Sequence, residues 1–512
     1  MQQTAFSFHG TLHAGFHFAV IDTITKYGRQ LTDHIPGPLC VPVLGCVGEA
    51  TTLTPKKLLA KSFEAYNLYG DTIKGWVLDR LFIFTSNAEL IEQFLVHSTQ
   101  TRKSNLYNIL KPWLGTGLLI SDSQKWYTRR KIITPTFHFT ILEQFLEIFD
   151  RQSTVLINCL SERANGVTKF DIMPYICSAT LDIIMESAMG VNVHAQTDKT
   201  MPYKIAVREI TNLMMWRFIR AHLNKELVFS ILCPLKKLRQ NKLIKIMHKF
   251  TKTVIEERRR ELEIQLNSEA EKNHDPHDIG ARKHMALLDV LLQASIDGRP
   301  LSNDDIQEEV DTFMFEGHDT TTTAISFTLY LVSRHSEVQK RLLSEIYAVF
   351  GELNIEPFTM SKLNELKYME CVIKESMRLY PPVPLIGREI SEDFHYTHSR
   401  FGDGIIPANT QFVISIFNTM RDPRYYEKPS DFIPDRHEDT SSSNPFTYIP
   451  FSAGQRNCIG QRFAMLEMKV ILCKIVREYE LLPFGVNVEP ILGIVLRSET
   501  GMQIGLKKRT SK

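Results

Sequence analysis

A single cysteine in a short loop bracketed by glycines constrains this chain more than any other stretch. The loop covers residues 450–460, and Cys458 lies near its end. Gly454 and Gly460 permit a tight turn and a close approach of the backbone to a flat ligand. The apolar stretch 461–478 predicts a helix directly after the loop, and the amides and dipole at its N-terminus would stabilise a thiolate.

From the loop alone, Cys458 has two interpretations. Free cysteines are usually buried and structural. A lone thiolate is also a strong ligand for soft metals, and it can bind haem iron axially, where it favours O–O cleavage. Arg456, two residues before the cysteine, would then pair with a carboxylate of the same ligand.

The loop resembles the haem-binding loop of the cytochrome P450 superfamily, Phe-x-x-Gly-x-Arg-x-Cys-x-Gly. This resemblance implies a bound haem b with Cys458 as its axial thiolate. Gln455 departs from the pattern, because proline is common at that position. The residues that match the pattern are Phe451, Gly454, Arg456, Cys458 and Gly460.

A second motif lies in a long helix that the sequence predicts over 306–333, opened by a capping box. Gly317 costs roughly 1 kcal/mol relative to alanine inside a helix, so we expect a close approach to a flat ligand there. Asp319 and Thr320 place an acid beside an alcohol, which suits a short proton relay. The alternative is that residues 320–323 are a β-branched packing stripe.

Residues 309–321 resemble the central helix of P450 family 4, the fatty-acid omega-hydroxylase group. In that group the glutamate before the glycine can be esterified to a haem methyl, and by position this is Glu316. A carboxylate held against an oxidised methyl could trap it. The alternative is that Glu316 stays non-covalent. Phe313 and Phe315 either line the substrate pocket or belong to the core.

Other cationic and aromatic residues fit the same ligand. Trp126 and Arg130 are four residues apart in a predicted helix over 123–134 and therefore share one face. The resemblance implies that both contact a haem propionate, and that Arg388 and Arg456 do likewise.

Three further basic residues of that helix, Lys125, Arg129 and Lys131, would project outward. They form either a basic patch for an acidic electron-transfer partner or an ordinary solvated face.

Glu375 and Arg378 share one face of another predicted helix at a spacing of three. The resemblance implies a structural triad, completed by Arg436, that fixes the loops around the cysteine. His437 stands where phenylalanine is common in the family. We expect this departure, with that at Gln455, to loosen these loops and to reduce stability or haem retention.

Composition fits one large domain in a reducing compartment. The chain has 512 residues, 43% of them hydrophobic, and a net charge of +2, which gives no nucleic-acid footprint. Eight cysteines without a C-x-x-C pair argue against a disulfide framework and a zinc site.

Two stretches bear on membrane attachment. Residues 12–24 are moderately apolar but polar side chains interrupt them, whereas a spanning helix needs about 20 mostly apolar residues. The apolar run 227–235, flanked by lysines, either dips into an anionic membrane surface or belongs to the core. We divide the chain into an atypical membrane-associated segment (1–34), a proline/glycine hinge (35–48) and a haem-thiolate monooxygenase domain (49–512).

The resemblance implies a mainly α fold with small β-sheets. It also implies terminal hydroxylation of fatty acids or related lipids, hormones or xenobiotics, with electrons from NADPH-cytochrome P450 reductase and cytochrome b5. The expected location is the cytoplasmic face of the endoplasmic reticulum membrane. Two alternatives remain open, a reductase-independent peroxide isomerase or dehydratase on the same fold and a non-catalytic haem-binding protein. An intact Asp319–Thr320 pair argues against the isomerase, which has no need to activate oxygen.

Overall fold

A computed structural model gives the fold of most of the chain. The apolar stretch 12–24 and most of the hinge lie outside the described residues. Within the described ranges, no helix joins the length and the apolar character needed to cross a bilayer. The described residues are 28, 30–39, 53–77, 80–96, 101–198, 200–220, 223–272, 286–352, 356–439 and 444–509.

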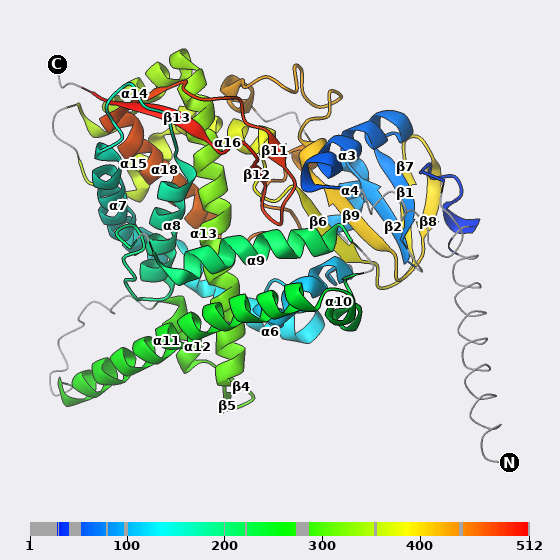
Figure 1. The fold of residues 1–512 in the computed structure, drawn as a ribbon, viewed down its shortest axis with the longest axis horizontal. Coiled ribbons are helices and arrows are strands. Elements are labelled where there is room, and N and C mark those ends of the chain that lie inside the picture. Colours follow the sequence, from blue (N-terminus) through cyan, green and yellow to red (C-terminus); the bar gives the residue numbers. More distant parts are fainter. Residues whose placement is uncertain are drawn as a thin grey trace.

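The architecture is mainly helical, as the sequence predicts, with the main sheet to one side and smaller sheets elsewhere (Figure 1). The helices are α3 (Pro55–Tyr69), α4 (Ala88–Val96), α5 (Lys111–Leu114), α6 (Ser123–Ile133), α7 (Phe139–Ser161), α8 (Met173–Ala188), α9 (Pro202–Phe218), α10 (Glu226–Leu232), α11 (Pro234–Lys272), α12 (Leu287–Gln293), α13 (Asn303–Arg334), α14 (Ser336–Phe350), α15 (Met360–Glu365), α16 (Lys367–Leu379), α17 (Ile416–Thr419) and α18 (Gln461–Glu478). Short 3-10 helices are η1 (Asn105–Leu110), η2 (Thr134–Phe137), η4 (Pro434–His437) and η5 (Pro445–Thr447).

Helix α13 is the central element, and it begins where the capping box predicts. The Ser302 side chain accepts from the Asp305 backbone N–H at 3.1 Å, and its hydroxyl donates to the Asp305 carboxylate at 2.7 Å. Helices α8, α11, α16 and α18 pack against α13, and α7 packs against both α8 and α18. The long helix thus runs through the helical part of the molecule (Figure 1).

The main sheet has the order β1-β2-β9-β6 and lies beside α3 and α4 (Figure 1). Strands β2 and β9 are parallel, with Phe82 opposite Gln411, and the other pairs are antiparallel. The strands are β1 (Thr72–Val77), β2 (Arg80–Thr85), β3 (Phe170–Asp171), β4 (Ser295–Ile296), β5 (Arg299–Pro300), β6 (Leu385–Glu389), β7 (Phe394–His398), β8 (Gly402–Ile406), β9 (Gln411–Ser415), β10 (Tyr479–Leu482), β11 (Pro490–Ile491), β12 (Arg497–Ser498) and β13 (Gln503–Lys508).

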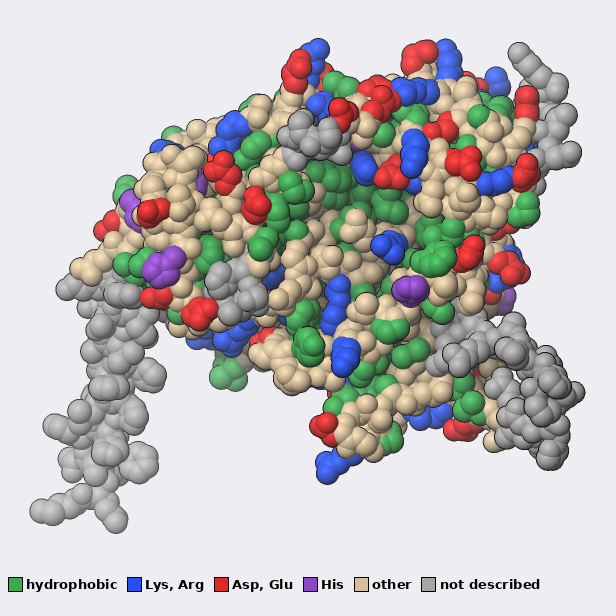
Figure 2. All heavy atoms as spheres, turned by 180° about the vertical axis from the view of Figure 1, so that it is seen from behind, with side chains coloured by type: hydrophobic (Ala, Val, Ile, Leu, Met, Phe, Trp, Pro, Cys, Tyr) green, Lys and Arg blue, Asp and Glu red, His purple; other side chains and the backbone are tan. Residues whose placement is uncertain are grey.

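Two apolar cores match these two parts. The larger core joins buried side chains of α7, α8, α13, α16 and α18. The smaller core lies under the main sheet, where the Phe94 and Phe412 rings stack with centroids 4.0 Å apart. On the face shown in Figure 2, acidic and basic side chains are intermixed with apolar ones, so that face presents no single-sign field.

Candidate functional site

The cysteine loop is fixed by backbone hydrogen bonds and by one obligatory glycine. The Cys458 N–H donates to the Phe451 carbonyl at 2.9 Å. Gly454 has φ +69°, and a Cβ there would lie 2.1 Å from the Leu95 carbonyl oxygen, just after the buried part of α4. The close approach at Gly454 is therefore to protein backbone. Gly460 has φ −89°, and a Cβ there would make only an ordinary contact, 3.9 Å from Cε1 of Phe137.

Gln455 occupies the second position of a β-turn. The Asn457 N–H donates to the Gly454 carbonyl at 3.1 Å, which closes the turn. Proline is favoured at this position because its ring presets the required φ. The departure at Gln455 therefore leaves the fold of the turn intact.

The Cys458 thiol is enclosed by protein groups yet keeps accessible surface, as a side chain lining an internal space does. Burial raises the pKa of the thiol to about 11, and the Glu316 carboxylate acts in the same direction. A hydrogen bond from the Gly460 backbone and the charge of Arg130 act the other way. The free thiol therefore keeps its proton at neutral pH, and a bound metal would displace it.

Glu316, Gly317 and Thr320 form an accessible face in the middle of the otherwise buried α13. The Thr320 hydroxyl donates to the Glu316 carbonyl at 2.7 Å. A Cβ at Gly317 would lie 2.7 Å from Cδ1 of Ile184, so the glycine also lets α13 pack closely against α8.

Lys103, Arg388 and Arg456 form a cationic cluster beside Glu316. Burial lowers the pKa of Lys103, and Arg388 and Arg456 lower it further, whereas Glu316 raises it. Burial and the Arg388 charge lower the pKa of Arg456 to about 9. Burial likewise raises the pKa of Glu316 to about 7 although Lys103 and Arg456 oppose this shift.

This cluster fits a ligand with two carboxylates. Arg388 is 1% exposed and Arg456 is 9% exposed, and in the part of the chain that the structure describes neither forms an ion pair with a carboxylate. Buried cations require compensating anions. The propionates of a haem would supply them, and Cys458 would supply a thiolate ligand for its iron. The residues present therefore fit a haem.

The structure gives Trp126 and Arg130 contacts within the protein. Arg130 donates to the backbone carbonyl and to Oδ1 of Asn457, each at 2.9 Å, so it fixes the cysteine loop from α6. The guanidinium of Arg456 lies 4.6 Å from the centre of the Trp126 ring. Backbone carbonyls of Thr101, Leu118 and Ser121 accept from Arg456.

We predicted that three basic residues of α6 project outward, and this prediction is wrong for two of them. Arg129 is 3% exposed and pairs with Asp305 of α13, and Lys125 pairs with Glu308 at 2.6 Å. Only Lys131 of the three is exposed. Acidic residues in the first turns of α13 draw the other two inward.

Asp319 does not lie on the accessible face of α13. Its side chain is 4% exposed, and Oδ1 accepts from Nη2 of Arg497 on β12. The other guanidinium nitrogen of Arg497 donates to Thr323 at 2.8 Å. Sequence reasoning missed Arg497, because it lies 178 residues from Asp319 and belongs to no motif.

The Glu375–Arg378–Arg436 triad is formed, and His437 is a fourth member. Arg378 holds both carboxylate oxygens of Glu375 at 2.8 and 2.9 Å, and Arg436 holds Oε1 at 3.0 Å. The His437 ring binds Oε2 at 2.9 Å. Burial raises the pKa of Glu375, but hydrogen bonds from His437 and Arg378 outweigh it and hold that pKa below its ordinary value. His437 thus adds a contact to the triad, although we expected it to loosen this region.

Phe315 belongs to the core. It is 2% exposed, and its ring centre lies 4.7 Å from that of Trp113. Phe313 is 6% exposed and stacks on Phe137 at 5.8 Å.

The apolar run 227–235 is a surface feature around α10. Phe229 is fully buried, but Leu227 is 73%, Ile231 68% and Leu235 80% exposed. Arg217 ties α10 down through a salt bridge with Glu226 at 2.9 Å.

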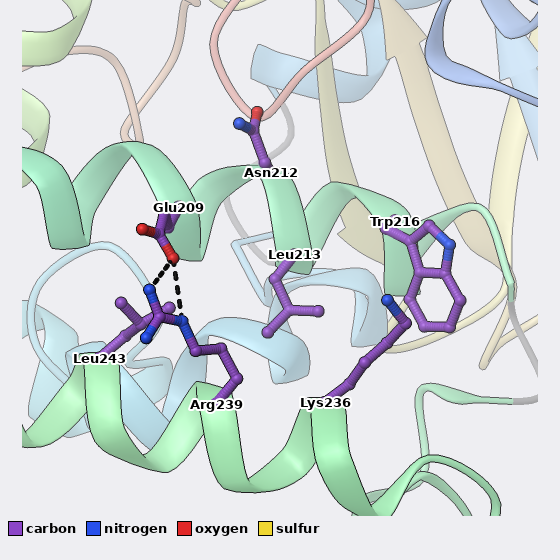
Figure 3. A pocket seen from close by; sticks show the side chains of 7 residues that line it. All are labelled: Glu209, Asn212, Leu213, Trp216, Lys236, Arg239 and Leu243. Atoms are coloured by element: carbon purple, nitrogen blue, oxygen red, sulfur yellow. Dashed lines mark hydrogen bonds and ion pairs between the residues drawn. The ribbon is translucent and has the colours of Figure 1, made fainter.

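Beside α10, α9 and α11 enclose a groove of about 330 Å³ (Figure 3). An ion pair between Glu209 and Arg239 lies at one end, and Lys236 lies over the Trp216 ring at the other. None of the predicted site residues lines this groove. Its lining residues are Glu209, Asn212, Leu213, Trp216, Lys236, Arg239 and Leu243.

Comparison with known proteins agrees with this site. The cytochrome P450 family model matches residues 35–505. Cytochrome P450 4d8 of Drosophila melanogaster is 53% identical over 457 residues, which cover 89% of this chain and 98% of that protein. Cytochrome P450 4d2 of the same species is 48% identical over 476 residues, covering 93% and 94%. The chain therefore belongs to the cytochrome P450 superfamily and, within it, to family 4.

Proposed function

We propose that this monooxygenase hydroxylates the terminal methyl of fatty acids or related lipids. Members of the superfamily are haem-thiolate monooxygenases, and the haem supplies the activation of O2 when it is bound. The observation that carries the narrower proposal is Glu316, which is enclosed on α13 and acts electrostatically on Cys458.

Cys458 is assigned as the axial thiolate. It lies directly before α18 and accepts a hydrogen bond from the Gly460 backbone, which stabilises an anionic sulfur. Arg130 holds the neighbouring Asn457, and this limits movement of the sulfur. Lys103, Arg388 and Arg456 are assigned to the propionates.

Glu316 is assigned to an ester with a haem methyl. Its carboxyl interacts with the cations that would hold the propionates. The carboxyl could therefore contact only one edge of a bound haem. Such an ester would hold the haem in one orientation, and a rigid site would favour attack at a chain end, where the C–H bond is stronger than at internal positions.

Membrane contact through α10 is part of the proposal. The exposed Leu227, Ile231 and Leu235 and the flanking Lys236 suit an anionic membrane surface. The adjoining groove extends this apolar surface between α9 and α11 (Figure 3). We place the enzyme on the cytoplasmic face of the endoplasmic reticulum, with NADPH-cytochrome P450 reductase and cytochrome b5 as electron donors.

Product analysis of the holoenzyme tests this function. The enzyme, reconstituted with the reductase and NADPH, is given saturated fatty acids of varied length, lauric acid among them. A terminal alcohol as main product is the expected result. Turnover of a lipid hydroperoxide without NADPH would favour the isomerase alternative. No product at all from an enzyme with normal thiolate-ligated haem would overturn the proposal.

Two cysteine variants test the haem ligand. Cys458→Ala should abolish the red-shifted Soret band of the reduced carbonyl form, because the thiolate causes that shift. Cys371→Ala changes a buried cysteine on α16 and should leave the band in place. A band that survives in Cys458→Ala would remove the assigned ligand.

A further inference from the structure

The residue that holds Asp319 comes from the C-terminal hairpin. Arg497 donates through Nη2 to Oδ1 of Asp319 and through Nη1 to Oγ1 of Thr323, at 2.8 Å. Residues 319 and 323 are one turn apart, so the guanidinium spans a single face of α13. Arg497 therefore fixes both the position and the direction of the Asp319 carboxylate.

The two carboxylate oxygens of Asp319 have different surroundings. Oδ1 is bound by Arg497, whereas Oδ2 is buried and has no hydrogen-bond partner among the described residues. A buried acceptor left without a partner is costly, and such groups often have a functional reason. Oδ2 is thus the oxygen that remains able to accept and pass on a proton.

The hairpin that carries Arg497 is itself well fixed. The Leu496 N–H donates to the Pro382 carbonyl at 2.8 Å, and the Leu492 N–H donates to the Pro55 carbonyl at 3.4 Å. The Leu496 carbonyl also accepts from Thr323 at 3.4 Å. Strand β12 is therefore held against α13 independently of the ion pair, and this makes Arg497 a rigid support for Asp319.

Asp319 and Thr320 face different surroundings. Successive helical residues are about 100° apart around the axis. Thr320 lies on the accessible face that includes Glu316, whereas Asp319 faces the hairpin. Proton transfer requires two groups within hydrogen-bond distance or joined by one bridging water. Transfer between Asp319 and Thr320 therefore requires that Asp319 be held at a fixed distance from Thr320.

We propose that Arg497 is a positioning residue for Asp319, and that it holds Oδ1 so that Oδ2 relays protons towards Thr320. This inference rests on the proposed function, because only an oxygen-activating enzyme needs the relay. In the step, Oδ2 takes one proton from a hydronium ion supplied by the solvent, which leaves water, and gives that proton to the Thr320 hydroxyl. That hydroxyl releases its own proton on the accessible face of α13, and both groups return to their starting states without oxidation or reduction.

A set of variants of the holoenzyme tests the role of Arg497. Arg497→Met removes the guanidinium with little change in length, and Arg497→Lys keeps one charged donor. Arg299→Met, on the exposed strand β5, serves as the matched control. The readouts are product formed per NADPH, hydrogen peroxide released, and the solvent isotope effect on kcat.

The expected result for Arg497→Met is a roughly tenfold fall in product per NADPH, with more peroxide and a larger solvent isotope effect. Arg497→Lys should recover part of the loss, and Arg299→Met should resemble the wild type. In an Asp319→Asn background, Arg497→Met should add no further uncoupling. If Arg497 had only a structural role, Arg497→Met would lower the product per NADPH equally in the wild-type and the Asp319→Asn backgrounds. That result would overturn the proposal.

A readout without catalysis accompanies this test. In urea unfolding, the Arg497→Met and Asp319→Asn substitutions should be non-additive by roughly tenfold in the unfolding equilibrium constant, as for paired residues. Additive effects would contradict the ion pair.

If the pair is confirmed but the wild type makes no hydroxylated lipid, the proposed function fails and the pairing stands. If lipid is hydroxylated and Arg497→Met stays fully coupled, the positioning role alone fails.

Discussion

The Nε2 atom of His437 lies 2.9 Å from Oε2 of Glu375, across 62 residues of sequence. Both side chains are buried, and the carboxylate has Arg378 and Arg436 as its other partners. The histidine therefore adds a hydrogen bond at a position where the family commonly has phenylalanine.

Replacement of His437 by phenylalanine should destabilise the protein. The ring packing on Tyr448 would be retained, but Glu375 would lose a donor, at a cost of about 1–3 kcal/mol. The urea midpoint and the fraction of haem that stays bound should both fall. His395→Phe, on the exposed side of β7, is the control and should change neither. A His437→Phe variant as stable as the wild type would show that the bond contributes nothing.

Gln455→Pro should stabilise the cysteine loop. Position 455 is the second residue of the turn closed by Asn457 and Gly454, and proline there lowers the entropy of the unfolded chain. The expected gain is about 0.4–1 kcal/mol in urea unfolding. Gln455→Ala should be nearly neutral. A loss of haem in the proline variant would mean that the loop needs the glutamine itself.

Glu316→Ala should abolish covalent haem attachment. After turnover with NADPH, part of the haem should co-migrate with the wild-type protein on a denaturing gel, because Glu316 is enclosed beside the site. Wild-type protein that has not turned over is the control and should release its haem. Complete extraction of haem from the turned-over wild type into acidic solvent would contradict the ester.

Charged substitutions on α10 should weaken binding to anionic vesicles. Leu227 and Ile231 are each more than half exposed, and burial of such a side chain in a membrane is worth about 1.5–3 kcal/mol. Leu227→Asp with Ile231→Asp should lower the partition coefficient in a flotation assay by more than roughly tenfold. Ile264→Asp, at an exposed position far along α11, is the matched control. Equal flotation of all variants would exclude α10 from the contact.

Asp311→Asn should flatten the dependence of stability on pH. Burial raises the pKa of Asp311 to about 7, although Thr251, Gln307 and Lys252 oppose the shift. The folded state therefore binds this proton more tightly than the unfolded state, so its contribution to stability falls as the pH rises from about 4 to 7. The slope is at most about 1.4 kcal/mol per pH unit.

The measurement is a series of urea midpoints over that pH range. The asparagine variant should lack this component of the slope, whereas Asp297→Asn, in an exposed turn, should keep it. Identical slopes for Asp311→Asn and the wild type would mean that Asp311 is already ionised in the folded protein.

The sequence predicts those parts of the site whose residues are close in the chain. Cys458 and its glycines, the Glu375–Arg378 pair and the capping box at Ser302 are set by local spacing, and the structure forms each of them. The mainly helical fold with small sheets follows from the resemblance and from apolar periodicity.

The residues that the sequence does not reveal join the site through distant contacts. Lys103 and Arg497 belong to no motif, and each reaches its partner only after the chain has folded. The pairing of Arg129 with Asp305 likewise depends on how α6 meets α13, so the periodicity of one helix could not give it. Gly317 shows the same limit, since its neighbour Ile184 comes from another helix.

The parallel pairing of β2 with β9 dictates an order of assembly during synthesis. Strand β2 ends at Thr85, and its partner begins at Gln411, so the main sheet stays incomplete until most of the chain has left the ribosome. Contacts between such distant segments form late and slowly. The carbonyls of residues 101, 118 and 121 gain their partner Arg456 later still, so the site for the prosthetic group is completed only late in synthesis.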